Sequence, residues 1–198
     1  TRLSRGLGDV YKRQFHDSKH NSLISNPNNP AFFVSNFNDA KNATSGIYLE
    51  LESPRDKVTQ IQAGIRAKYV NWDAGDVNGT PAMMNMSAAT LRDRFNAADR
   101  EDSEVNIDAV LKISQQIKKS LDLIASAGRK NRSASYQERY LWLPMRATAG
   151  LADGNTYVGN INLDAETSNE IAFGFDFRGQ SVYFSPRLFY KEIKDYIQ

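Results

Sequence analysis

The chain has 198 residues, with 25 Lys and Arg against 23 Asp and Glu, no Cys, and a hydrophobic fraction of 40%. That apolar content argues against wholesale disorder, and the absence of Cys excludes disulfide scaffolds, thiol catalysis and Cys-ligated metals. No run of apolar residues is long enough for a transmembrane helix.

The first fourteen residues carry much of the positive charge. Residues 5–14 read RGLGDVYKRQ and match one translated frame of the transposase end sequence that is used to prepare sequencing libraries. We therefore predict that residues 1–14 are an artefactual, adapter-derived segment, and we exclude them from the fold. Without their four basic residues and one acid, 21 basic and 22 acidic side chains remain. No basic stripe is left to contact phosphates, so no nucleic-acid partner is expected.

The rest of the chain reads as strands and turns. Residues 15–42 include the stretch NPNNP at 26–30 and are predicted to form a loop. From residue 43 onward apolar side chains alternate with polar ones, which is typical of strands with one apolar face. Short turns at 53–56, about 116–120 and 178–180 join these runs in pairs. We predict six strands in three hairpins, at about 43–71, 104–131 and 168–196.

The connections between the hairpins distinguish two all-β folds. They lie near 72–103 and 131–167, are polar, and are each about thirty residues long, which is rare in compact soluble domains. A transmembrane β-barrel has short periplasmic turns, long extracellular loops, and strands with one apolar face toward lipid. A two-sheet sandwich also alternates polar and apolar residues, so alternation alone leaves both folds open. The loop asymmetry favours a partial antiparallel transmembrane β-barrel over residues 43–198.

Three segments resemble a known family. Residues 159–168 read GNINLDAETS, residues 170–179 read EIAFGFDFRG, and residues 128–138 read GRKNRSASYQE. Together they resemble the C-terminal barrel region of TonB-dependent outer-membrane receptors. Ile161 and Ala165 stand where that family usually has prolines.

The resemblance implies a fragment of a 22-stranded barrel that is plugged by an N-terminal domain. Such a receptor lies in the cell outer membrane and imports a scarce ligand, such as a siderophore or a metal chelate, with energy transmitted through TonB. The implied partners are outer-membrane lipid, the rest of the barrel and its plug, the TonB system, and a small-molecule or metal ligand. The alternatives are a plug-less porin or adhesin barrel and a secreted β-sandwich binding module.

The second long connection contains the candidate ligand-binding residues. Large aromatic side chains together with Arg are typical anchors at binding surfaces. Two explanations remain open: these side chains contact a ligand, or the segment folds into the barrel mouth and packs on itself. The candidates are Arg132, Tyr136, Arg139, Tyr140, Trp142 and Arg146.

The first long connection contains a methionine cluster, Met83, Met84 and Met86. Thioether sulfur is a soft ligand suited to Cu(I), so a copper-capturing extracellular site is one interpretation. In the alternative interpretation, the methionines pack under a short helix from about residue 87 to residue 98.

No catalytic site is predicted. His16 and His20 have a spacing that could serve a metal on a helix, but their polar, Asn-rich surroundings favour a surface loop. The chain contains no HExxH motif, no glycine-rich phosphate loop and no nucleophile elbow. We therefore expect neither an enzyme nor a bound cofactor.

Overall fold

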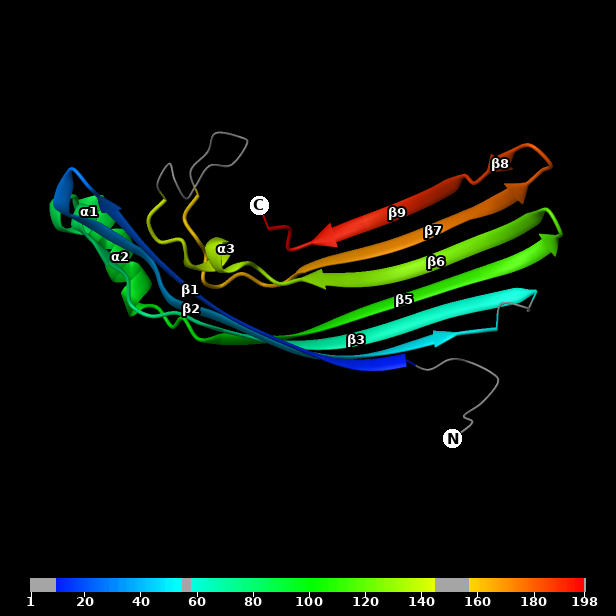
Figure 1. Cartoon of the computed structure of the whole chain (residues 1–198), viewed down its shortest axis with the longest axis horizontal. Coiled ribbons are helices and arrows are strands. Elements are labelled where there is room, and N and C mark those ends of the chain that lie inside the picture. The colour runs from blue at the N-terminus through cyan, green and yellow to red at the C-terminus, as the bar shows by residue number, and fades with distance from the viewer. Residues whose placement is uncertain (1–9, 55–57, 145–156, 198) are drawn as a thin grey trace.

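The computed structural model describes residues 10–54, 58–144 and 157–197. Its strands form one sheet in the order β1-β2-β3-β5-β6-β7-β8, with β4 beside β2 and β9 beside β7 (Figure 1). The strands are β1 (Val10–Asn26), β2 (Asn29–Glu52), β3 (Thr59–Asp73), β4 (Asn78–Gly79), β5 (Asp102–Lys118), β6 (Leu121–Arg132), β7 (Glu166–Arg178), β8 (Tyr183–Phe184) and β9 (Arg187–Lys194). The helices are α1 (Thr80–Met84), α2 (Met86–Ala97) and α3 (Tyr136–Tyr140).

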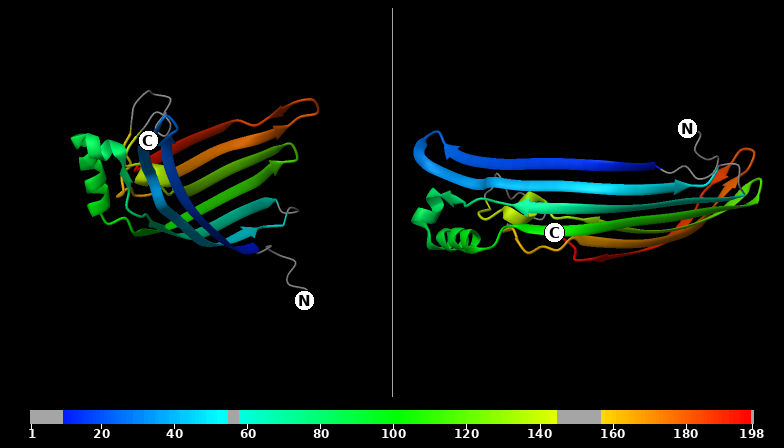
Figure 2. Two further views of the ribbon diagram at one scale, coloured as in Figure 1. Left: turned by 60° about the vertical axis from the view of Figure 1, so that its left-hand side comes forward. Right: turned by 90° about the horizontal axis from the view of Figure 1, so that it is seen from below.

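All neighbouring strands pair antiparallel, and the sheet curves into an open trough (Figure 2). The strand order ends at β1 on one side and at β9 on the other, so the trough is part of a barrel wall and is not a closed barrel. Within the described residues, no helix is both long and apolar enough to cross a membrane.

The two ends of the trough differ. At the short-turn end, β5 joins β6 through residues 119–120, and β7 joins β8 through residues 179–182. At the long-loop end lie the turn between β1 and β2 and the connections that contain α1, α2 and α3 (Figures 1 and 2). This is the loop asymmetry that the sequence predicts for a transmembrane barrel.

The strand register separates an outer face from an inner face. Ile47 pairs with Ala67, which pairs with Ile107, so one face collects the apolar positions of successive strands. These side chains remain substantially exposed, which a soluble surface seldom tolerates over so wide an area but a lipid-facing surface requires. The exposed apolar residues of this outer face include Ile47, Leu49, Ile61, Ile65, Leu111, Ile113, Ile171, Phe173 and Leu188.

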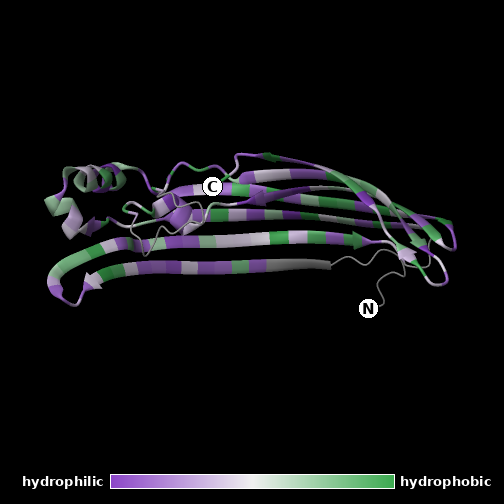
Figure 3. Cartoon of the chain, turned by 90° about the horizontal axis from the view of Figure 1, so that it is seen from above, coloured by the Kyte–Doolittle hydropathy of each residue, from purple (hydrophilic) through white to green (hydrophobic). Residues whose placement is uncertain are grey.

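The predicted loop over residues 15–42 is wrong. Most of this segment belongs to β1 and β2, which pair with each other along their length and turn at residues 27–28. The Asn28 backbone N–H donates to Asn26 Oδ1 at 2.9 Å and closes that turn. Figure 3 shows mostly polar residues over this ribbon, which explains the error: strands that extend beyond an apolar band need no apolar face.

The strand count is also corrected, because the sheet contains nine strands within the described residues and not six. The three expected hairpins correspond to β2–β3, β5–β6 and β7–β9, and the additional strands are β1, β4 and β8. Residues 10–14, at the end of the segment predicted to be adapter-derived, continue β1; the artefactual origin of residues 1–14 stays a prediction.

Pro186 interrupts the last hairpin between β8 and β9. A Cβ atom added to Gly174 would clash with the Pro186 carbonyl oxygen, so only glycine allows the backbone of β7 to approach this break. The proline therefore occupies an irregular point in the ladder, as expected for a residue without a backbone N–H.

Candidate functional site

The long connections fold together into a cap over the long-loop end, and this cap contains the buried core of the described chain. Phe37 from β2, Trp72 from β3 and Phe95 from α2 meet there with Tyr140 and Trp142. The side chain of Asn85 caps the N-terminus of α2, because its Oδ1 accepts from the backbone N–H groups of Ser87 and Ala88. The cap is thus a small folded unit built from segments far apart in sequence.

Arg139 lies at the centre of this cap and is 1% exposed. Its Nη1 donates to Asp102 Oδ2 at 2.7 Å and to the Ile161 carbonyl at 2.9 Å, and its Nη2 donates to the Leu163 carbonyl at 2.6 Å. The guanidinium also lies 5.0 Å from the centre of the Trp72 ring. A buried charge with so many partners ties the second connection to β5 and β3.

Tyr140 and Trp142 are each 1% exposed and use their polar atoms on backbone carbonyls. The Tyr140 hydroxyl donates to the Arg100 carbonyl at 2.8 Å, and Trp142 Nε1 donates to the Ser35 carbonyl at 3.0 Å. Burial raises the pKa of the Tyr140 phenol to about 12, so this group stays a neutral donor. Both side chains therefore connect the cap to its neighbours.

Arg132 and the start of α3 form a second network. Ser135 caps the helix: its side chain accepts from the Glu138 N–H, and its own N–H donates to Glu138 Oε2. Arg132 binds Glu138 at 3.0 Å and Glu166 at 3.3 Å. Burial raises the pKa of Glu138, but the Ser135 N–H and the Arg132 guanidinium outweigh burial and lower it below its usual value.

Among the predicted ligand-binding residues, Tyr136 contacts the β1–β2 ribbon. Its ring stacks on His20 of β1 with ring centres 3.9 Å apart, and Phe37 meets it edge-on at 5.0 Å. The stack joins α3 to the β1–β2 ribbon. His20, which the sequence places in a loop, therefore belongs to the cap.

The structure brings five of the six ligand-binding candidates into the cap, and Arg146 lies outside the described residues. The burial of Arg139, Tyr140 and Trp142 favours the alternative in which this segment folds into the barrel mouth and packs on itself. Asp102 and Trp72 are the partners that the sequence did not indicate. Trp72 and Asp102 are neighbours only because β3 pairs with β5, and a local sequence motif does not show which strands pair.

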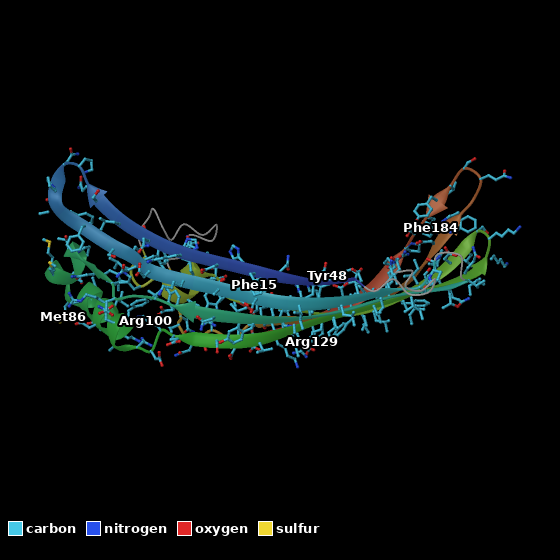
Figure 4. All side chains as sticks on the ribbon, turned by 60° about the horizontal axis from the view of Figure 1, so that its bottom comes forward. Phe15, Tyr48, Met86, Arg100, Arg129 and Phe184 are labelled. Carbon is cyan, nitrogen blue, oxygen red and sulfur yellow. The ribbon has the colours of Figure 1, made fainter. Side chains whose placement is uncertain are left out.

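The methionine cluster is on the surface of the cap. Met83, Met84 and Met86 are 63%, 83% and 87% exposed, whereas Phe95 on α2 is buried. A helix is present close to the expected range, but the interpretation that the methionines pack beneath it is wrong (Figure 4). Three thioethers within four residues are accessible from outside. Among the described residues, no cluster of His, Asp and Glu that could hold a metal ion is present.

The inner face below the cap carries a charged network. Asp108 on β5 accepts from Arg66 Nε at 2.9 Å and from the Asn131 backbone N–H at 2.8 Å, and Lys68 Nζ lies 3.8 Å from it. A basin of about 620 Å³ opens beside this network. Its lining includes Tyr48, Glu50, Arg66, Asp108, Lys112 and Lys130. The polar residues of the strands thus line one continuous surface opposite the lipid-facing band.

Comparison with known proteins agrees with this arrangement. The family model described as TonB dependent receptor-like, beta-barrel matches residues 2–198. The chain belongs to the TonB-dependent receptor β-barrel family. The match begins inside the segment that we predict to be adapter-derived. The family is one of outer-membrane receptors, so the outer face of this TonB-dependent receptor segment corresponds to a lipid-facing barrel surface.

Among solved structures, the segment is similar to the copper transporter OprC, with a TM-score of 0.64 and 16% sequence identity. The similarity covers 96% of this chain and 27% of that transporter, so the segment spans about a quarter of the length of its structural relative. No curated protein sequence matches the chain.

Proposed function

We propose that this segment forms part of an outer-membrane receptor that imports a scarce small ligand, with energy delivered through TonB. The observation that carries the proposal is the family match over residues 2–198 on a sheet with an apolar outer face and a polar inner face. The wall would enclose the path of the ligand, and the cap would stand over its entrance.

The test is growth of a strain that lacks the complete receptor gene. We expect the deletion strain to lose growth on at least one defined metal or siderophore source, and to recover it when the gene is restored. A complementing gene without its TonB-interacting segment is the matched control and should fail to restore growth. Normal growth of the deletion strain on every scarce source, in a background without duplicate receptors, would contradict the proposal.

We further propose that the cap retains two of the predicted ligand-facing side chains. Tyr136 and Arg132 are not fully buried, whereas Arg139, Tyr140 and Trp142 hold the cap together. The assignment of Arg146 stays a prediction. In this arrangement the buried residues act on ligand binding only by positioning Tyr136, which stacks on His20.

A soft metal ion is the second candidate ligand. The exposure of Met83, Met84 and Met86 supports it, because an ion can reach their sulfur atoms and soft sulfur donors suit Cu(I). Apolar methionine side chains are otherwise more stable when buried than in contact with water. The similar solved structure is that of a copper transporter, although at 16% identity this similarity concerns the fold alone. The metal would be cargo of the receptor and not a resident cofactor.

Two triple variants of the complete receptor test the metal proposal. Replacing all three methionines by Ser removes both the sulfur atoms and the apolar side chains, whereas replacing them by Leu removes only the sulfur atoms. If the methionines bind the ion, both variants should lose Cu(I) binding and its competition by Ag(I). If the Leu variant binds Cu(I) as the unmodified receptor does, sulfur ligation is excluded.

A further inference from the structure

The outer face carries an unpaired cation beside its apolar band. Arg129 lies in β6, next to Ala109 of β5 and Asn169 of β7. Its side chain is exposed, and it makes no ion pair or hydrogen bond with any residue that the structure describes. Figure 4 shows it projecting from the convex side of the sheet. By contrast, Lys41 near the same end is paired with Asp73 at 3.0 Å.

A groove of about 540 Å³ runs beside Arg129 across β5, β6, β7 and β9. The short side chains of Ala109 and Ala127 lower the surface there. Larger apolar side chains border the depression, including Leu111, Ile171 and Tyr190. The groove is therefore mostly apolar, with the guanidinium of Arg129 as its cation.

The height of the groove on the barrel wall indicates which leaflet of the membrane it faces. Arg129 is three residues from the end of β6 at Arg132, so it lies toward the long-loop end. In a barrel with extracellular long loops, this is the half of the wall beside the outer leaflet. A charged side chain on the lipid-facing surface is costly unless it reaches the interface or meets an opposite charge.

The charges of the groove favour an anion. Two glutamates also line it. Glu170 precedes the outward-facing Ile171 in β7, so its side chain lies on the inner face, whereas the Glu192 carboxylate lies 3.9 Å from Lys194 Nζ. On the outer face Glu192 and Lys194 therefore offset each other, and Arg129 leaves an excess positive charge. A guanidinium matches the oxygens of a phosphate group and binds them through two parallel hydrogen bonds. An acyl chain could lie along the apolar row that the strand pairing forms from Leu111, Ala127, Ile171 and Tyr190.

We propose that this groove is a binding site for a phosphate-bearing lipid of the outer leaflet, with the phosphate at Arg129 and an acyl chain along the groove. The inference rests on the proposed outer-membrane function, because it requires that the outer face contact lipid. It adds a specific lipid site to a surface that would otherwise contact lipid without preference.

The first test counts the phosphorylated lipids that remain on the complete receptor after purification from outer membranes in mild detergent, by native mass spectrometry. Arg129→Ala should reduce retention about tenfold, the scale of losing one charge-assisted contact. Lys130→Ala is the matched control: it removes the same charge from the adjacent residue, which faces the inner side, and should change retention little. Equal retention by Arg129→Ala and the unmodified receptor would overturn the proposal, and so would an equal loss in Lys130→Ala.

A second variant tests the apolar part of the site. Ala127→Leu fills the groove without changing any charge, so it should also lower lipid retention while Arg129 is intact. Millimolar inorganic phosphate should not displace the lipid; if it does, the site is an anion site and not a lipid site. A receptor that fractionates away from the outer membrane would contradict the proposed function, whereas an outer-membrane receptor with unchanged lipid would contradict only this inference.

Discussion

The cap and the wall beneath it are stabilised in different ways. The cap has a buried core of its own, in which Trp72 and Tyr140 are at most 3% exposed. In the wall, Ile47, Ile65 and Phe173 are more than half exposed. The cap is therefore held by contacts within this chain, whereas the wall depends on backbone pairing, on lipid outside it, and on whatever fills the lumen.

The largest effect that separates the two regions is expected for Arg139→Ala. The change leaves Asp102 and two partly buried carbonyls without their donor, and we expect the cap to lose about 3 kcal/mol, toward the low end for a broken buried pair because Asp102 is half exposed. Protease cleavage within the cap of the complete receptor should rise by about a hundredfold at that cost, since each 1.4 kcal/mol is about tenfold. The barrel itself should stay folded.

Arg92→Ala provides the control for this comparison. Arg92 pairs with Asp93 on the surface of α2, where ion pairs contribute between about 0 and 1 kcal/mol. Similar protease sensitivity of the Arg92 and Arg139 variants would show that the buried network does not stabilise the cap.

In the wall, Gly174→Ala is expected to have an intermediate effect. The new Cβ would require the β7 backbone or the Pro186 carbonyl to move, which costs about 1–3 kcal/mol in a packed structure. The urea midpoint of the receptor in lipid vesicles measures it. Gly128→Ala is the control, because its Cβ would lie 3.7 Å from the nearest atom; equal midpoints of the two variants would disprove the steric argument.

The smallest expected effect concerns pH and the cap. The pKa of Glu138 is lowered in the folded cap, so its stabilising contribution is complete above the ordinary value of 4.5 and is lost as the pH falls through the lowered value. The loss should be less than about 1 kcal/mol because Arg132 is half exposed. The protection factor of the α3 amides, which is the intrinsic exchange rate at each pH divided by the observed rate, should therefore fall below pH 4.5 in the unmodified receptor but not in Glu138→Gln. Identical pH profiles would contradict this assignment.

The three hairpins could be predicted because each has one face in an apolar environment and the other face in a polar one. Alternation at Ile61, Ala63 and Ile65 reports that environment directly in the sequence. Residues 15–42, which form most of β1 and the first part of β2, could not be found in this way, because much of this segment has polar residues on both faces. Its turn does leave a signal: Pro27 and Asn28 lie between the apolar pairs Leu23–Ile24 and Phe32–Phe33, which is typical of a hairpin.

The sequence could predict which residues gather in the candidate site, but not which of them hold the cap together. The aromatic and Arg residues of the second connection are gathered in the cap, as expected, but a sequence does not show that Arg139 has Asp102 as its partner. That pairing depends on where β3, β5 and α3 meet. The methionines show the opposite case. One interpretation packed them under a helix near residues 87–98, but α1 ends at Met84 and α2 begins at Met86, so the cluster belongs to the helices themselves and lies on their exposed side.

The length of β2 has a practical consequence. Its 24 residues extend about 80 Å at the usual rise of a strand, whereas the apolar band of an outer-membrane barrel is about 25 Å tall. The turn at residues 27–28 is therefore far from the bilayer and is closed by only a few polar contacts. Such tips tolerate insertions, so a peptide tag placed between Pro27 and Asn28 would be accessible to antibodies on intact cells.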